Sequence, residues 1–199
     1  MFKHRQTVGY TLISGFIVGS FLVYLSTAQQ VFQHQYKLIN EFPYIFAALA
    51  VSAGTATLLN GWLVLKMGME RLVTIALYAF FTIPLVYVVL FYGSSNPSLG
   101  VLLSFFAMQF FAIGFLFGNL RAMAMEPIGH IAGIGAAITG FISTIMAVPI
   151  SIYIGTFIDA TALPLFIGFS ICSFLSVLII IYLRLESKRQ KRKALDLLS

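Results

Sequence analysis

The fourth apolar stretch of this sequence carries one amide, Gln109, close to its midpoint. At about 100° per residue, a helix would place on the same face Phe105, Ala112, Ile113 and Leu116. An amide without a partner is costly in apolar surroundings, so Gln109 must meet either a bound solute or another helix. Small-molecule pockets combine apolar walls with a few polar groups, which favours Phe105, Gln109 and Ile113 as candidates for binding a small amphipathic substrate. An interhelical hydrogen bond is the alternative.

Hydroxyl groups form a stripe along the first apolar stretch. At helical spacing, an arc of roughly 140° contains Tyr10, Ser14, Ser20, Tyr24 and Thr27. Such a stripe can line a substrate cavity, and on this interpretation Tyr10, Ser14, Ser20 and Tyr24 are candidate cavity residues. Serine and threonine also hydrogen-bond the main chain of their own helix, in which case the stripe serves helix packing. The sequence leaves both interpretations open.

Small residues follow one face of the fifth apolar stretch. An arc of roughly 100° contains Ala132, Ala136, Thr139, Gly140, Ser143 and Ala147. Helix backbones approach closely where side chains are small. We therefore expect this face to pack on another helix, with Ala132, Ala136, Gly140 and Ser143 as candidate interface residues.

Groups that catalyse reactions or bind metals are missing from the interiors of the apolar stretches. His4, His34 and His130 lie outside these stretches or at their ends, and Cys172 is the single cysteine. The spacing of these residues fits no metal site, and no phosphate-binding glycine loop is present. We expect no metal, no cofactor and no enzymatic activity, and no membrane carboxylate that could relay protons.

Six apolar stretches must position these residues, and each is long enough to cross a bilayer as a helix. They are residues 8–28, 42–65, 72–92, 99–120, 131–154 and 163–183. Hydrophobic residues make up 60% of the chain and charged residues 9%, with a mean hydropathy of +0.98. The sequence therefore predicts an all-α integral membrane protein, a six-helix bundle over residues 1–184 in contact with the lipid bilayer, and a basic tail over residues 185–199.

Basic residues are distributed unequally between the two sides of the predicted bundle. The gaps on one side hold Lys3, Arg5, Lys66, Arg71, Arg121, Arg184, Lys188, Arg189, Lys191, Arg192 and Lys193, and those on the other side hold Lys37 alone. Basic loops stay in the cytoplasm, so both termini are expected there, in a multi-pass protein of the inner or plasma membrane. The basic tail is suited to bind the anionic lipids of the cytoplasmic leaflet. The sequence has no basic surface interleaved with aromatic residues, as binding of nucleic acid would require.

Short gaps between the stretches make helical hairpins in sequence the simplest packing. Pro84 and Pro149 lie well inside their stretches, so each should bend its helix and free a carbonyl that a neighbour must satisfy. Read as two groups of three, the helices have inverted topology, since the first group starts in the cytoplasm and the second outside. This 3+3 arrangement is the unit from which major-facilitator transporters are assembled.

Two junctions carry a family resemblance. Residues 117–137, with Asn119, Arg121, Glu126 and His130, resemble the tenth-to-eleventh helix junction of major-facilitator drug:proton antiporters of the bicyclomycin-resistance type. Residues 60–71 resemble that superfamily's eighth-to-ninth helix loop, and include Asn60, Gly68 and Arg71. The resemblance implies gating or loop roles for these seven residues, with Gly68 permitting a tight turn and Arg71 available to cap a helix end. An Asp common in the better-kept copy of that loop is replaced by Leu65 or Lys66.

The resemblance covers essentially the whole chain, but only the second half of such a transporter. It implies that spans one and four line the cavity, that spans two and five meet the opposite half, and that spans three and six face lipid. The expected function is therefore one half of a secondary transporter for drug or small-solute efflux by alternating access, completed by an N-terminal half or by a second copy in a homodimer. The alternative is a non-transporting membrane protein that binds or regulates a partner through its small-residue helix face.

Overall fold

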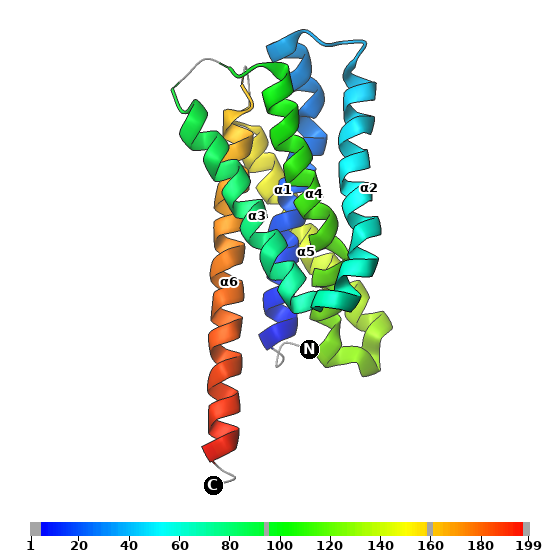
Figure 1. Ribbon diagram of the computed structural model, residues 1–199, viewed down its shortest axis with the longest axis vertical. Coiled ribbons are helices and arrows are strands. Elements are labelled where there is room, and N and C mark those ends of the chain that lie inside the picture. Colours follow the sequence, from blue (N-terminus) through cyan, green and yellow to red (C-terminus); the bar gives the residue numbers. More distant parts are fainter. Residues whose placement is uncertain (1–4, 94–95, 159–160, 197–199) are drawn as a thin grey trace.

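The computed structural model describes residues 5–93, 96–158 and 161–196, and their regular structure is all helical (Figure 1). The elements are α1 (Arg5–Tyr36), α2 (Phe42–Met67), α3 (Met69–Phe91), α4 (Leu99–Met125), the 3₁₀ helix η1 (Glu126–Ile131), α5 (Ala132–Gly155) and α6 (Leu163–Asp196). Each of the six predicted stretches lies in one of the six α-helices, although residue 92 falls just beyond α3 and residue 131 closes η1.

Five helical segments of the described chain are long and apolar enough to cross a membrane. The longest, residues 99–155, contains α4, η1 and α5 without an intervening loop. The helical path nevertheless breaks at η1, where Ile128 and Ile131 have non-helical φ values of −122° and −123°. Pro127 stands at the start of η1 and lacks the amide hydrogen that would continue α4. The chain therefore turns back there, and α5 runs in the opposite direction to α4 (Figure 1).

The turn between α2 and α3 depends on Gly68. Its φ of 78° lies in the left-handed region that side-chain-bearing residues rarely adopt, and its N–H closes α2 by donating to the Val64 carbonyl at 2.9 Å. The prediction that Gly68 permits a tight turn is thus confirmed.

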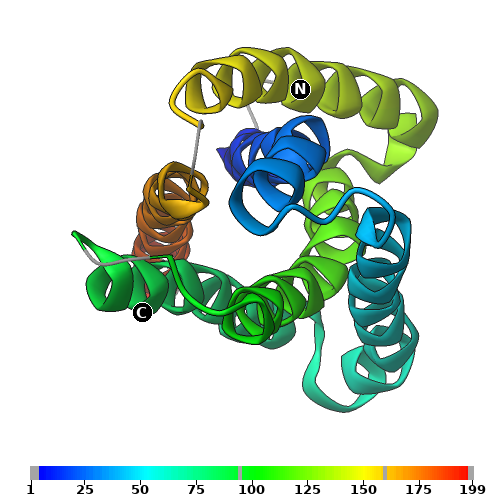
Figure 2. The same cartoon turned by 90° about the horizontal axis from the view of Figure 1, so that it is seen from above.

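The helices do not pack as consecutive hairpins, so that expectation is wrong. α1 packs mainly on α5, and α2 on α4, while α1 and α4 contact each other. Figure 2 accordingly shows α1 and α4 between α5 on one flank and α2 on the other, with α3 and α6 along the remaining side. Among the described residues, the neighbours α1 and α2 touch at few points, as do α4 and α5, and only α3 and α4 form an extensively packed consecutive pair.

Glycines bring the two non-consecutive pairs close together. A Cβ on Gly19 of α1 would lie 3.3 Å from the Ala147 main chain of α5, and one on Gly114 of α4 would lie 2.4 Å from the Ala53 carbonyl oxygen of α2. Apolar helices in lipid gain most from such close main-chain approach. These glycines therefore explain why α1 packs on α5 and α4 on α2.

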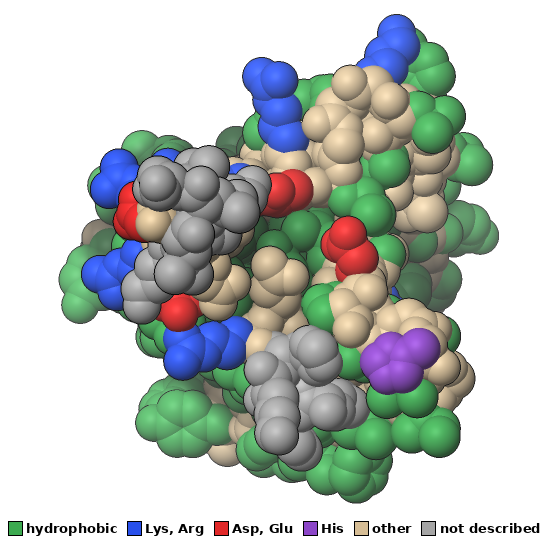
Figure 3. Space-filling model, turned by 90° about the horizontal axis from the view of Figure 1, so that it is seen from below, with side chains coloured by type: hydrophobic (Ala, Val, Ile, Leu, Met, Phe, Trp, Pro, Cys, Tyr) green, Lys and Arg blue, Asp and Glu red, His purple; other side chains and the backbone are tan. Residues whose placement is uncertain are grey.

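Both ends of the described chain lie at one end of the bundle (Figure 1). This end carries the described basic residues except Lys37, which terminates α1 at the opposite end with a φ of 56°; Lys3 lies outside the described residues. Figure 3 shows the basic side chains around a hollow on this face. α6 continues as one helix to Asp196, so the described part of the predicted tail is helical. Lys, Arg, Glu and Leu are all good helix formers, which explains the extension.

Candidate functional site

Gln109 reaches a carbonyl that Pro84 leaves without its helical partner. Proline at position 84 lacks the N–H that would bond the Phe80 carbonyl one turn earlier in α3. The Gln109 side chain is 0% exposed, and its Nε2 donates to the Phe80 oxygen at 3.2 Å. A neighbouring helix thus satisfies the freed carbonyl, as expected for Pro84, and the interhelical alternative for Gln109 is the one observed. Its Oε1 has no hydrogen-bond partner among the described residues.

Replacing Gln109 with leucine should destabilise the bundle by about 0.5 to 2 kcal/mol, the range of single interhelical hydrogen bonds in membranes. Pro84→Ala should remove most of that cost, because its new amide N–H can donate to the Phe80 carbonyl within α3. The measurement is thermal unfolding in detergent of the four members of this double-mutant cycle. An equal cost of Gln109→Leu in both backgrounds would show that the bond and the proline are not coupled.

The hydroxyl stripe of α1 is turned into the bundle rather than toward open space. Ser14, Ser20 and Tyr24 are at most 5% exposed, and Ser20 donates to the Phe16 carbonyl of its own helix at 2.9 Å. The Tyr24 ring packs edge-on against Phe110 with centroids 4.6 Å apart, and its hydroxyl has no partner in the described part of the chain. In this conformation the stripe serves packing, and one unsatisfied hydroxyl is left near the centre.

Aromatic rings surround the other predicted cavity residues of α4. Phe105 is partly buried and packs edge-on against Tyr87 of α3, with centroids 5.2 Å apart, while Ile113 is 1% exposed. Tyr87 in turn stacks on Phe166 of α6 at 3.8 Å. The interior therefore joins α1, α3, α4 and α6 through rings, and it buries polar atoms that lack partners among the described residues, in Tyr24, Tyr87 and Gln109.

Two predicted junction residues contact each other across helices. The Asn119 amide donates to the Asn60 side-chain oxygen at 2.6 Å, and Asn60 donates back at 3.4 Å. Asn119 also donates to the Phe115 carbonyl at 2.9 Å. A reciprocal amide pair of this kind holds α2 to α4 near the end of the bundle that contains both termini. The structure thus brings together residues from the two junctions that carry the family resemblance.

A polar cavity of about 810 Å³ opens at the end of the bundle that holds both termini, where Figure 3 shows the hollow. We call it the end cavity. Residues from α1, the α2–α3 turn, α3, the junction of α4 with η1, and α6 line it, among them Tyr10, Gly68, Glu70, Arg71, Glu126 and Arg184. Four of these lining residues are site residues predicted from the sequence. Tyr10 belongs to the predicted substrate cavity, and the predicted gating or loop group contains Gly68, Arg71 and Glu126. The cavity therefore unites one predicted cavity residue with three predicted loop residues.

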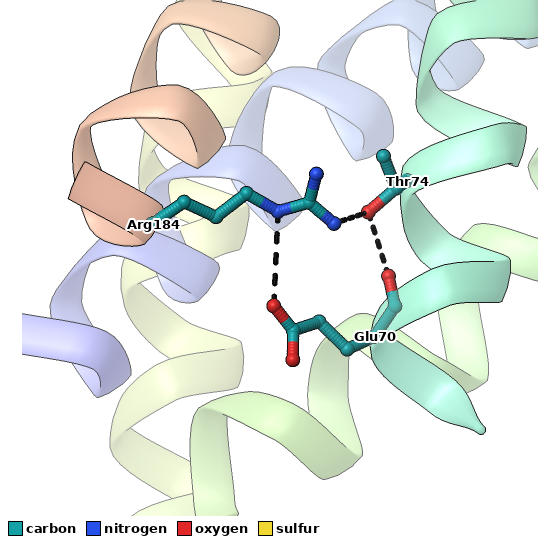
Figure 4. A network of polar contacts seen from close by, with 3 residues as sticks. All are labelled: Glu70, Thr74 and Arg184. Carbon is teal, nitrogen blue, oxygen red and sulfur yellow. Dashed lines mark hydrogen bonds and ion pairs between the residues drawn. The ribbon is translucent and has the colours of Figure 1, made fainter. Parts of the chain in front are cut away.

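An ion pair closes one wall of the end cavity (Figure 4). The Arg184 guanidinium of α6 donates to the Thr74 hydroxyl of α3, and its Nε lies 3.7 Å from Glu70 Oε1, an ion-pair distance longer than a hydrogen bond. The Thr74 hydroxyl donates to the Glu70 carbonyl at 2.6 Å. Because Glu70 is 66% exposed, the pair adds little stability, but it joins the ends of α3 and α6.

Sequence reasoning missed this network. The sequence places Arg184 only among the basic residues at the helix ends and Glu70 only within the stretch 60–71, and it predicts no role for Thr74. The spacing of Glu70 and Thr74, four residues apart on one helix face, was a usable signal. Their partner on α6 could not be identified, since it lies 110 residues away in the chain.

The small-residue face of α5 is divided by the fold. Ser143 lies against α1 and donates to the Thr11 carbonyl at 3.2 Å, and Thr139 and Ala147 are also buried. Ala132 and Ala136 are exposed, and a Cβ on Gly140 would meet no atom within 4 Å. Half of the predicted face is therefore used inside the chain, which removes Ser143 from any surface offered to a partner.

The remaining junction residues lie near the same end of the bundle. Arg121 is exposed and borders a small gap between α1, α4 and α5 that Ser14 also lines, and His130 is exposed on η1. Within the described residues, no group of three or more His, Cys, Asp or Glu side chains could hold a metal ion.

Comparison of the chain with protein-family models, with curated proteins and with solved structures found no match.

Proposed function

We propose that this chain is one six-helix half of a secondary transporter, built as two inverted three-helix repeats. The observation that carries the proposal is the helix packing: exchanging α1, α2 and α3 with α4, α5 and α6 leaves the set of packed pairs unchanged. The pair α1–α5 becomes α4–α2, and α1–α6 becomes α4–α3. The pairs α1–α4 and α3–α6 map onto themselves, and the weak pairs α1–α2 and α2–α3 map onto α4–α5 and α5–α6.

Two hydrogen bonds between helices are related by the same exchange of the two helix triplets. Ser143 of α5 donates to a main-chain carbonyl of α1, and Ser52 of α2 donates to the Ala107 carbonyl of α4 at 2.7 Å. α1 and α4 run in opposite directions in Figure 1, as helices related by an inverted repeat do. Equivalent helices thus make equivalent contacts, which supports an internal repeat rather than a fortuitous bundle.

The buried faces agree with a transporter half that needs a second bundle. Within the most apolar 18-residue stretch of each helix, 11% of the residues of α2 are buried, against 61% of those of α1. Both α2 and α5 present large apolar side chains on the outer flanks of the bundle. We assign these flanks to contact with the second bundle, and α1 and α4 to the cavity side. That bundle is another part of a longer polypeptide, a separate chain or a second copy.

The resemblance to bicyclomycin-type antiporters supports efflux of small amphipathic molecules by alternating access. The basic end of the bundle supports placing both termini in the cytoplasm, in the inner or plasma membrane. The alternative, a protein that binds a partner through the small-residue face of α5 without transporting, leaves the repeated pattern of helix packing unexplained. The transporter half is therefore the function we prefer.

The proposal predicts that α5 takes part in assembly with the second bundle. Ala136→Leu and Gly140→Leu add bulk at open positions, so the fraction of assembled complex should fall at least several-fold while the unfolding temperature of the chain stays nearly constant. Cross-linking in native membranes measures assembly. Thr82→Leu, at an exposed site on α3, is the control. Undiminished assembly in both α5 variants would contradict the assignment.

A further inference from the structure

A long apolar groove runs between α2, α3 and α4. Its volume is about 630 Å³, and its walls are almost entirely apolar. Residues that line it include Leu59, Leu63, Ile75, Ala79, Met108 and Phe111. α2 and α3 diverge here, since they touch at few points, and α4 forms the floor. The groove is thus an opening in the side of the bundle that an apolar chain can fill.

The length of the groove matches one leaflet of a bilayer. On α3 the lining runs from Leu72 to Ile83, which at 1.5 Å per residue is roughly 16 Å. Half of a hydrocarbon core is about 15 Å thick. Since Leu72 follows the first turn of α3, the groove begins at the end of the bundle that carries the basic residues and reaches about the midplane. An acyl chain of a single leaflet has this extent.

Two cations stand where the groove meets that end. Lys66 and Arg71 flank the α2–α3 turn, are exposed, and form no ion pair with any described residue. Lys66 lies over the Trp62 ring at 3.7 Å, and tryptophan is typical of the lipid–water interface.

The acidic groups near this end of the groove do not neutralise Lys66 and Arg71. Glu70 is paired with Arg184, and Glu126 begins η1 and lines the adjoining end cavity. Met67 and Ile75 line both the groove and the end cavity, so the two are continuous. The mouth thus offers two free cations to an anion seated between polar and apolar surroundings.

We propose that this groove binds one acyl chain of an anionic phospholipid, with the headgroup phosphate paired to Lys66 and Arg71. An apolar slot of leaflet length that ends at two unpaired cations and an interfacial tryptophan suits an acyl chain with an anionic headgroup, as in an anionic phospholipid, and does not suit a soluble anion. The site is distinct from the bundle interior, and it does not depend on the proposed transport function.

The test compares phosphatidylglycerol with phosphatidylcholine of the same acyl chains, bound to the purified, delipidated full chain and counted by native mass spectrometry. Phosphatidylglycerol should bind more tightly. Lys66→Gln with Arg71→Gln should weaken its binding roughly thirty-fold, and that of phosphatidylcholine much less, because the choline group offsets the charge of the phosphate. Lys37→Gln removes a cation at the opposite end of the bundle and should change neither lipid.

Bulk in the groove should have a different effect from loss of charge. Ala79→Trp should weaken both lipids, whereas Leu85→Trp, on an exposed part of α3 outside the groove lining, should weaken neither. Phosphatidylglycerol with a photoreactive group on its acyl chain should label residues of α2, α3 and α4 that line the groove. This measurement needs no substitution, so the proposal remains testable if Ala79→Trp does not fold.

Four results would overturn the proposal. Equal affinity for the two lipids, or unchanged phosphatidylglycerol affinity after loss of Lys66 and Arg71, would remove the headgroup site. Photolabelling confined to α5 and α6 would place the lipid elsewhere. A change of oligomeric state in Ala79→Trp without any change in lipid binding would show that a second copy of the chain occupies the groove.

Discussion

Gly114→Leu is expected to separate α2 from α4 and to cost about 3 kcal/mol, the upper end of the usual penalty for overpacking. A Cβ at position 114 would lie 2.4 Å from the Ala53 carbonyl oxygen and 2.7 Å from the Ala56 Cβ. The first of these is main chain, so no side-chain rotation relieves the clash. The two helices would have to move apart, and the hydrogen bonds of Ser52 and Asn60 to α4 would be lost with the contact.

Gly118→Leu provides the matched control, because it lies one turn later on the same helix and its Cβ would meet nothing within 4 Å. The measurement is thermal unfolding in detergent, together with protease sensitivity of the α2–α3 turn around Gly68. We expect the turn to become sensitive in Gly114→Leu and to stay protected in Gly118→Leu. Equal stability of the two variants would mean that α2 does not need its close approach to α4.

The chain alone is expected to insert into liposomes but to show no transport against a gradient when a pH difference is imposed. Alternating access needs a second bundle to move against, and proton coupling needs a titratable group within the membrane. The apolar stretches contain no Asp, Glu or His in their interiors. Of the described acidic residues in the site, Glu70 and Glu126 line the end cavity rather than the membrane interior.

Substrate flux in proteoliposomes, with and without a pH gradient, measures this directly. A homodimer could supply the second bundle, and it should then support only flux that follows the substrate gradient. Uphill movement driven by protons would contradict the expectation and would place the coupling group within this chain. Restored uphill movement after addition of a second bundle with a membrane carboxylate would support the division of roles between the halves.

Local chemistry made several features predictable from the sequence. The six apolar stretches correspond to helices because main-chain hydrogen bonds in lipid must be satisfied within each segment. Pro84 had to free a carbonyl, because proline has no amide hydrogen, and Gly68 had to turn, because glycine tolerates positive φ. The apolar span 163–183 does not by itself predict that α6 continues to Asp196, where charged residues that favour a helix extend it.

Tertiary structure alone decided which helix each surface meets. The sequence showed that Gln109 needs a partner but could not select the Phe80 carbonyl, and it showed a small-residue face on α5 but not that Ser143 would bond α1. It also could not reveal that α1 packs on α5 and α2 on α4, or that Arg184 meets Glu70 across 114 residues of chain. Hydropathy determines that a segment is buried in a membrane, but lipid and protein are equally apolar neighbours. The choice between them depends on shape and on a few hydrogen bonds between segments distant in sequence, and these exist only once the chain is folded.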